Sequence, residues 1–252
     1  MPEAVIVDAV RTPIGRAAKG SLKDMRADDL AAVPLVALQE RNPDVNFAET
    51  TDIIWGAANH EGEQGYNLGR TVGLLAGIDH HVPGMTLNRF CSSSLQSIRM
   101  AFHAITSGEG DQYVAGGSES VSRVPGSEVP SHPMLDGSPE AKYDIYLSMG
   151  VTAENVAERC NVSREAQDEW AVVSQNRAVD AQGSGHFDRE IVPVTLPDGT
   201  IVTKDDGPRP GTTMEKLASL KPVFREGGTV TAGNACPLND GAAATLVMSA
   251  EK

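Results

Sequence analysis

The chain has 252 residues, of which 40% are hydrophobic and 22% charged, an ordinary balance for a folded protein. Its net charge of −13 argues against nucleic acid as a partner, because phosphate binding requires a basic surface. Three widely spaced cysteines favour reduced thiols over a disulfide framework, and no cysteine–histidine spacing predicts a metal site. No signal-peptide pattern or membrane-length apolar run occurs, so we expect a cytoplasmic protein with no membrane partner.

Strands and helices alternate along the first half of the chain. Residues 4–10 form an apolar run that predicts a buried strand. A helical pattern starts at residues 28–30, and Pro34 inside it predicts a kink or a late start. The same patterns predict strands at residues 52–56, 85–90 and 112–119 and helices at residues 67–77 and 91–108. This alternation predicts an α/β fold whose sheet is mixed but mostly parallel, with helices on both faces.

The segment 85–108 places Cys91 where a strand gives way to a helix. Functional groups gather at the carboxyl ends of strands in such folds. The first turn of the helix would also present unpaired N–H groups and the positive end of its dipole to the thiol, which favours the nucleophilic thiolate. The alternative is a small buried apolar residue. The expected buried stripe of this helix is Leu95, Ile98, Phe102 and Ile105.

The pattern changes after residue 122. Residues 122–142 are rich in proline, glycine and serine and predict a loop. We expect a helix over 149–159 with Thr152 as a possible N-cap, and a second helix capped by Ser163. Residues 187–194 and 200–203 predict short strands joined by a Pro-Asp-Gly turn. Residues 120–231 are therefore interpreted as an insertion that leaves the sheet and returns to it.

Five segments resemble motifs of the thiolase family, in chain order and over nearly the whole chain. They are Val-Arg-Thr-Pro-Ile-Gly at 10–15, Asn-Arg-Phe-Cys-Ser-Ser-Ser at 88–94, Val-Ala-Gly-Gly-Ser-Glu-Ser at 114–120, Met-Gly-Val-Thr-Ala-Glu-Asn-Val-Ala at 149–157, and Thr-Ala-Gly-Asn-Ala-Cys-Pro-Leu-Asn-Asp-Gly-Ala at 231–242. The resemblance implies a thiolase-like N-terminal domain over residues 1–252, with residues 120–231 as its inserted loop domain.

The resemblance also implies an activity. A thiolase cleaves 3-ketoacyl-CoA thiolytically or runs in reverse as a Claisen condensation, and Cys91 would carry the acyl group. The backbone N–H of Cys91 is a candidate oxyanion donor. CoA and its thioesters would be substrates, with no further cofactor, and the full-length protein is expected to be a homodimer or homotetramer.

Substrate contacts are implied by position in the family motifs. Arg209 matches an arginine near the adenine and phosphate end of CoA, and a solvated surface arginine is the alternative. Met149 matches a residue lining the acyl pocket, and core packing is the alternative. Cys236 replaces a serine that contacts the pantetheine arm, and sulfur is a weaker hydrogen-bonding partner. Ser148 stands where many biosynthetic members have histidine, which favours degradative substrates.

Part of the family's machinery is missing from this sequence. It contains no Gly-His-Pro, Asn-Glu-x-Phe or Cys-x-Gly motif, and these belong to a second α/β half. We therefore expect a C-terminal domain to be absent and this chain alone to have little turnover and to self-associate through uncovered apolar surface. The six histidines are expected to be ordinary surface or satisfied residues: His60, His80, His81, His103, His132 and His186.

Two other functions remain open at this point. A thiolase-like module without catalysis could bind CoA or lipid, or serve as a dimerisation half. A ketosynthase-type condensing enzyme also uses a cysteine nucleophile but pairs it with two histidines, and the motif at 149–157 argues against it.

Overall fold

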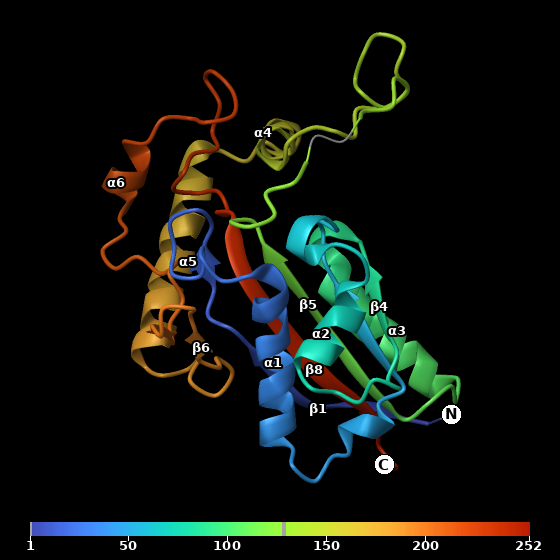
Figure 1. The fold of residues 1–252 in the computed structure, drawn as a ribbon. Coiled ribbons are helices and arrows are strands. Elements are labelled where there is room, and N and C mark those ends of the chain that lie inside the picture. The colour runs from blue at the N-terminus through green and yellow to red at the C-terminus, as the bar shows by residue number, and fades with distance from the viewer. Residues whose placement is uncertain (1, 128–129) are drawn as a thin grey trace. The chain divides into compact units, whose positions relative to one another are not determined.

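A computed structural model describes residues 2–127 and 130–252 of the chain (Figure 1). The chain divides into two compact units. The first comprises Met1–Gly126, His186–Gly207 and Leu238–Lys252, and the second comprises Ser127–Gly185 and Pro208–Pro237. The predicted insertion at 120–231 overlaps the second unit, but its stretch His186–Gly207 packs within the first.

The first unit is a six-stranded sheet with helices. Its strands are β1 (Ala4–Arg11), β2 (Gly15–Arg16), β3 (Asp52–Gly56), β4 (Gly84–Leu87), β5 (Gln112–Ser120) and β8 (Asn239–Ser249). Its helices are α1 (Ala27–Arg41), α2 (Leu68–Leu75) and α3 (Ser93–Thr106), with 3-10 turns η1 (Phe47–Glu49), η2 (Gly62–Gln64) and η3 (Phe90–Ser92). A separate hairpin pairs β6 (Val194–Thr195) with β7 (Ile201–Val202). The strands expected at 187–194 and 200–203 are thus only two residues long.

The sheet is mixed, which confirms the predicted fold class. Its strand order is β1-β8-β5-β3-β4, with β2 beside β8. The strands β5, β3 and β4 run parallel, as their helical crossovers require, whereas β8 pairs antiparallel with both β5 and β1. The prediction of a buried first strand is wrong: β1 lies at the sheet edge, and Ile6 and Val7 are 57% and 46% exposed.

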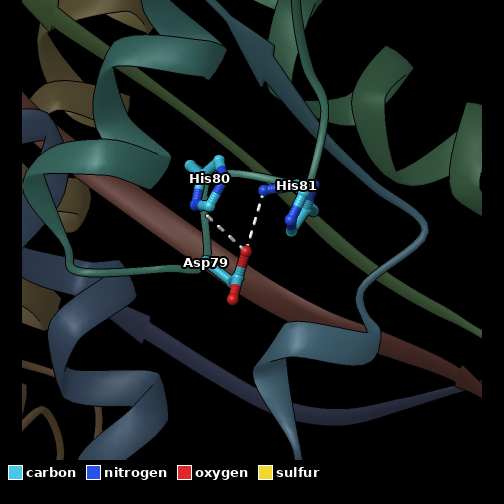
Figure 2. A group of neighbouring side chains, drawn as sticks. All are labelled: Asp79, His80 and His81. Atoms are coloured by element: carbon cyan, nitrogen blue, oxygen red, sulfur yellow. Dashed lines mark hydrogen bonds and ion pairs between the residues drawn. The ribbon is translucent and has the colours of Figure 1, made fainter.

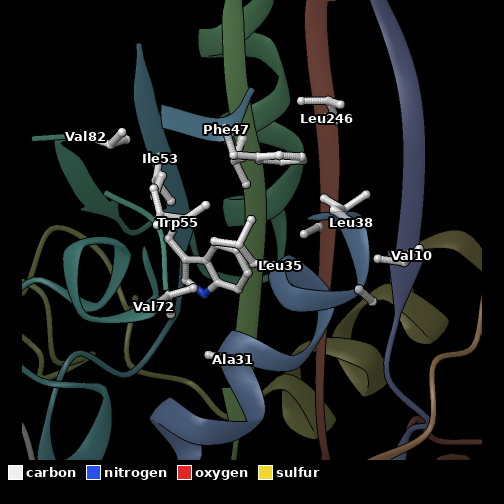
Figure 3. Close-up of a cluster of buried hydrophobic side chains, with 14 of the residues drawn as sticks. Val10, Ala31, Leu35, Leu38, Phe47, Ile53, Trp55, Val72, Val82 and Leu246 are labelled. Atoms are coloured by element: carbon white, nitrogen blue, oxygen red, sulfur yellow. The ribbon is translucent and has the colours of Figure 1, made fainter. Parts of the chain in front are cut away.

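Side chains of successive strand residues enter two different cores, because a strand directs them to opposite faces. On one face, Ile53 and Trp55 pack with Leu35 of α1 and Val72 of α2 (Figure 3). On the other face, Ile54 packs with residues of α3 in a second cluster. Helices therefore cover both faces of the sheet, as predicted, and α3 alone supplies the helical side chains of the second cluster.

Two helices differ in detail from the predictions. Pro34 does not delay α1, which begins at Ala27 and runs through it. The buried face of α3 is Ser93, Ser97, Ala101 and Ile105. Ile105 was predicted to be buried, and the predicted Ile98 packs partly buried against the same core. Small side chains allow α3 to lie close to the sheet, and the Ser97 hydroxyl donates a 3.0 Å hydrogen bond to Gly116 O. Leu95 and Phe102 are instead 68% and 46% exposed.

The second unit contains α4 (Met149–Cys160), α5 (Arg164–Gly183) and α6 (Met214–Ala218). Ser163 caps α5 as predicted, accepting from Ala166 N. The N-cap of α4 is Ser148, not Thr152, because Ser148 is the last extended residue before the helix. Residues 122–142 contain no helix or strand among those described. Within the described parts of the chain, no helix is both long and apolar enough to cross a membrane.

Candidate active site

Cys91 lies in the short turn η3 between β4 and α3, one position before the helix N-cap Ser92. Phe90, directly before it, has a φ of +48°, a left-handed conformation that is uncommon for a bulky residue. Such strained backbone persists only where surrounding contacts hold it in place. The turn presents Cys91 at the surface, where the residue is exposed.

Two polar side chains hold this turn. Asn88 donates from Nδ2 to Ala58 O at 2.8 Å and accepts at Oδ1 from Phe90 N at 2.7 Å. The Ser93 hydroxyl accepts from Arg89 N at 2.9 Å and donates to Phe90 O at 2.7 Å. Together they satisfy the N–H and C=O of Phe90 and the N–H of Arg89, and so hold the backbone directly before Cys91.

A glycine lets the start of α3 lie against the sheet. A Cβ atom built on Gly56, at the end of β3, would come within 2.7 Å of the Ser93 carbonyl carbon and 2.8 Å of Ser94 N. Both atoms belong to helix backbone, which cannot rotate away as a side chain can. Gly56 therefore sets the distance between β3 and the turn that carries Cys91.

Replacing Gly56 by alanine is expected to displace the start of α3, destabilise the chain by about 1–3 kcal/mol and lower the reactivity of Cys91. Gly207→Ala is the matched control, because a Cβ there meets nothing within 4 Å. Urea denaturation and the alkylation rate of Cys91 measure both effects. Equal behaviour of the two variants would contradict the proposed role of Gly56.

Cys91 lines a cleft of about 590 Å³ at the carboxyl ends of β3 and β5. The cleft lies entirely within the first unit, and its walls include Asn59, Phe90, Ser94 and Glu119. The thiol is thus reachable from solvent and faces a volume that could admit a small acyl group. Among the described residues, no histidine lines this cleft.

Glu119 holds another part of the cleft wall. Its carboxylate accepts from Ala58 N at 2.7 Å and from Gln64 Nε2 at 2.7 Å. Gln64 is fully buried, and its Oε1 accepts from Ser120 N at 2.7 Å. These contacts tie the loop after β3 to the end of β5. Both Glu119 oxygens accept hydrogen bonds. The carboxylate therefore stabilises the loop after β3 in addition to lining the cleft.

The predicted CoA-contacting residues lie in the second unit, whereas Cys91 lies in the first. Arg209 is exposed, and its backbone N–H donates to Gln175 Oε1 at 2.9 Å. Met149 is 72% exposed at the start of α4. The alternative interpretation of Met149 as a core residue is therefore wrong. Cys236 is exposed, and its Sγ donates to Pro237 O at 3.4 Å. Their roles in binding CoA stay predictions.

Sequence reasoning missed several supporting residues. Asn88, Ser93 and Glu119 occur in the quoted motifs, but only their hydrogen bonds show what they do. Spacing along the chain could not pair Glu119 with Gln64, 55 residues earlier. The expectation that the histidines are ordinary surface residues agrees with the exposure of all six.

Comparison with known proteins gives a consistent result. A family model described as "Thiolase, N-terminal domain" matches residues 4–251. The chain is 46% identical over 271 aligned positions to a beta-ketoadipyl-CoA thiolase of Acinetobacter baylyi, covering 100% of this chain and 67% of that protein. It is 43% identical over 264 positions to a 3-ketoacyl-CoA thiolase of Bacillus subtilis, with the same coverage.

A solved structure agrees with these sequence matches. The crystal structure of the Bacillus anthracis acetyl-CoA acetyltransferase is similar to this chain with a TM-score of 0.87 and 37% sequence identity. The match covers 100% of this chain and 66% of that one. The chain therefore spans about two thirds of the length of these relatives.

Proposed function

Since the chain belongs to the thiolase family, we propose that it supplies the nucleophilic half of an acyl-CoA acyltransferase in which Cys91 carries the acyl group. The observation that supports this most directly is the exposed Cys91 on a constrained turn, beside an open cleft and before a helix. Thiolytic cleavage of 3-ketoacyl-CoA and the reverse Claisen condensation are the proposed reactions.

In the cleavage direction, the Cys91 thiolate would attack the 3-keto carbon of the substrate. The bond between carbons 2 and 3 then breaks, its electron pair passes to the acetyl-CoA fragment, and that fragment takes up a proton. This leaves an acyl thioester on Cys91. Attack by the thiol of a second CoA releases the shortened acyl-CoA and restores Cys91, so one difficult step becomes two easier ones.

We propose that the proton-transfer groups of this reaction lie outside the chain. The described residues place no histidine in the cleft, and Glu119 is held by hydrogen bonds to Ala58 and Gln64. The backbone N–H of Cys91, at the approach to α3, remains our candidate oxyanion donor. We accordingly expect little turnover from this chain alone.

The substrate and assembly are proposed on the family relationship. CoA and its thioesters would be the only small molecules required, with Arg209 near the phosphates, Met149 near the acyl chain and Cys236 near the pantetheine arm. We propose a cytoplasmic enzyme that acts as a homodimer or homotetramer. The relatives' names, which refer to beta-ketoadipyl-CoA and 3-ketoacyl-CoA, are compatible with a degradative direction.

A non-catalytic role is the second candidate, favoured by exposed apolar side chains beside the site. Phe90 is 74% and Leu95 68% exposed, which suits a surface that another protein segment covers. In that case Cys91 would occupy its turn without accepting an acyl group. The two functions therefore differ in whether the Cys91 thiol becomes acylated.

The deciding experiment incubates the chain with an acyl-CoA, whose acyl group can pass to the Cys91 thiol with release of CoA and without carbon–carbon cleavage, and maps adducts by peptide mass spectrometry. We expect one acyl group on Cys91 and none on Cys160 or Cys236, although all three thiols are exposed. A chain that binds CoA in calorimetry but gains no adduct on Cys91 would instead support the binding module.

A further inference from the structure

Three adjacent side chains with metal-binding atoms project from the turn between α2 and β4. They belong to Asp79, His80 and His81, and all three residues are exposed (Figure 2). One carboxylate oxygen and one nitrogen from each imidazole lie within 4.8 Å of one another. None of the three residues lines the cleft that contains Cys91.

The backbone of this turn is held from both sides. Val82 N donates to Asp79 O at 3.0 Å, which closes the turn. The Arg70 guanidinium on α2 donates to His80 O at 2.6 Å and also to Val82 O. Ile78 and Val82, on either side of the three residues, are 6% and 2% exposed and anchor the turn in the core. The three side chains therefore start from a fixed backbone, which reduces the entropy lost when they converge on an ion.

The carboxylate of Asp79 is suited to an ion. Its Oδ1 accepts from His81 N at 2.9 Å and lies 3.5 Å from His80 Nδ1. This oxygen is therefore already beside the two residues with which it would share an ion.

The two imidazoles are close and free to reorient. Their ring centroids are 4.1 Å apart, and the His80 side chain is 74% exposed. Rotation of an exposed side chain can move its terminal atoms by roughly 1–2 Å without displacing packed neighbours. That movement is enough to bring the ligand atoms to the roughly 2.0–2.2 Å at which nitrogen and oxygen bind zinc.

We propose that Asp79, His80 and His81 form a surface site for a divalent transition-metal ion. Two imidazole nitrogens and one carboxylate oxygen suit Zn²⁺, Ni²⁺ and Cu²⁺, whereas Mg²⁺ and Ca²⁺ prefer oxygen ligands throughout. Water would complete the coordination. The Arg70 guanidinium is directed at backbone carbonyls, and the net charge of −13 attracts cations to the chain.

The test is calorimetric titration of the whole chain with Ni²⁺ at about pH 7.5, after alkylation of the cysteines so that sulfur does not compete. We expect one ion per chain with a dissociation constant on the order of 100 µM or tighter. The double variant His80→Ala/His81→Ala should lose at least about tenfold in affinity, and Asp79→Asn should lose less.

Two exposed histidines elsewhere provide the control. His103→Ala/His186→Ala removes the same number of imidazoles and should leave the affinity unchanged. All variants alter exposed side chains, and their denaturation midpoints should match that of the parent chain. The proposal is overturned if the parent chain binds no Ni²⁺ at millimolar concentrations, if the His80/His81 variant binds as tightly as the parent, or if the control variant loses binding equally.

Discussion

Replacing Cys91 by alanine is expected to abolish the release of CoA that accompanies acylation of the chain by an acyl-CoA. The rate should fall on the order of a thousandfold or more, because the reacting atom itself is removed. Two hydroxyls that line the cleft already have hydrogen-bonding partners. The Ser93 oxygen is engaged with Arg89 N and Phe90 O, and the Ser118 oxygen accepts from Trp55 Nε1 at 3.0 Å.

The measurement is the CoA released in the first turnover, quantified by chromatography. Cys160→Ala is the matched control, since it removes another exposed thiol, one that lies in the second unit. We expect the control to release up to one equivalent of CoA per chain, as the parent does. If Cys91→Ala released CoA at the parent rate, the assignment of the nucleophile would be wrong.

Replacing Glu154 by alanine is expected to be the most destabilising substitution in the second unit. Glu154 lies on α4 and is 3% exposed. Its carboxylate accepts from Val230 N at 2.7 Å, from Thr229 N at 2.9 Å and from the Thr229 hydroxyl at 3.0 Å. Removing it would leave these donors without a partner. Each buried unsatisfied donor costs about 1–3 kcal/mol, so we expect a loss of at least about 2 kcal/mol in the free energy of unfolding.

The same contacts predict how stability depends on pH. Burial alone would raise the Glu154 pKa, but the amides of Val230 and Thr229, the Thr229 hydroxyl and the charge of Arg225 lower it overall. A carboxylate whose pKa is lower in the folded state stabilises the fold above the ordinary value of about 4.3. This contribution disappears as the pH falls below that value and through the folded-state pKa.

Glu158→Gln is the matched control for Glu154→Ala. It lies one helical turn further along α4, its side chain is 78% exposed, and it pairs with Arg225 at 3.1 Å. An exposed ion pair of this kind contributes about 1 kcal/mol or less. Denaturation monitored through Trp170, which lies on α5 of the same unit, should separate the variants. Equal destabilisation by the two substitutions would show that the buried hydrogen bonds of Glu154 do not stabilise the unit.

Local patterns predicted the elements around Cys91 well. The strands at 52–56 and 112–119 and the helices on both faces follow from hydrophobic periodicity, which the chain expresses clearly there. The end predicted for α3, residue 108, is also close to the observed one: the helix ends at Thr106, and Gly108 follows with a φ of +77°. Periodicity was wrong for Leu95 and Phe102 of α3 but right for Ile105. Hydrophobic periodicity gives little weight to small residues, and Ser93, Ser97 and Ala101 occupy the rest of the buried face.

Contacts between distant segments could not be predicted from the sequence. Residues 186–207 join the first unit partly because Arg11 of β1 pairs with Glu190 and Asp205 at 2.8 Å each, and these partners lie far apart in the chain. The hydrogen bonds of Asn88, Ser93 and Glu119 around the cleft likewise depend on the fold. The motifs indicated where the chemistry lies, and the structure shows which residues hold it there.

The central claim is that Cys91 is the reactive thiol of this chain, and competition among its three exposed cysteines tests it most directly. The chain is treated with limiting iodoacetamide, and the modification of Cys91, Cys160 and Cys236 is followed over time by peptide mass spectrometry. We predict that Cys91 reacts several-fold faster than the other two, because it lies at the amino end of α3, and that an acyl-CoA slows only its alkylation. Equal rates at all three positions, unaffected by acyl-CoA, would contradict the account.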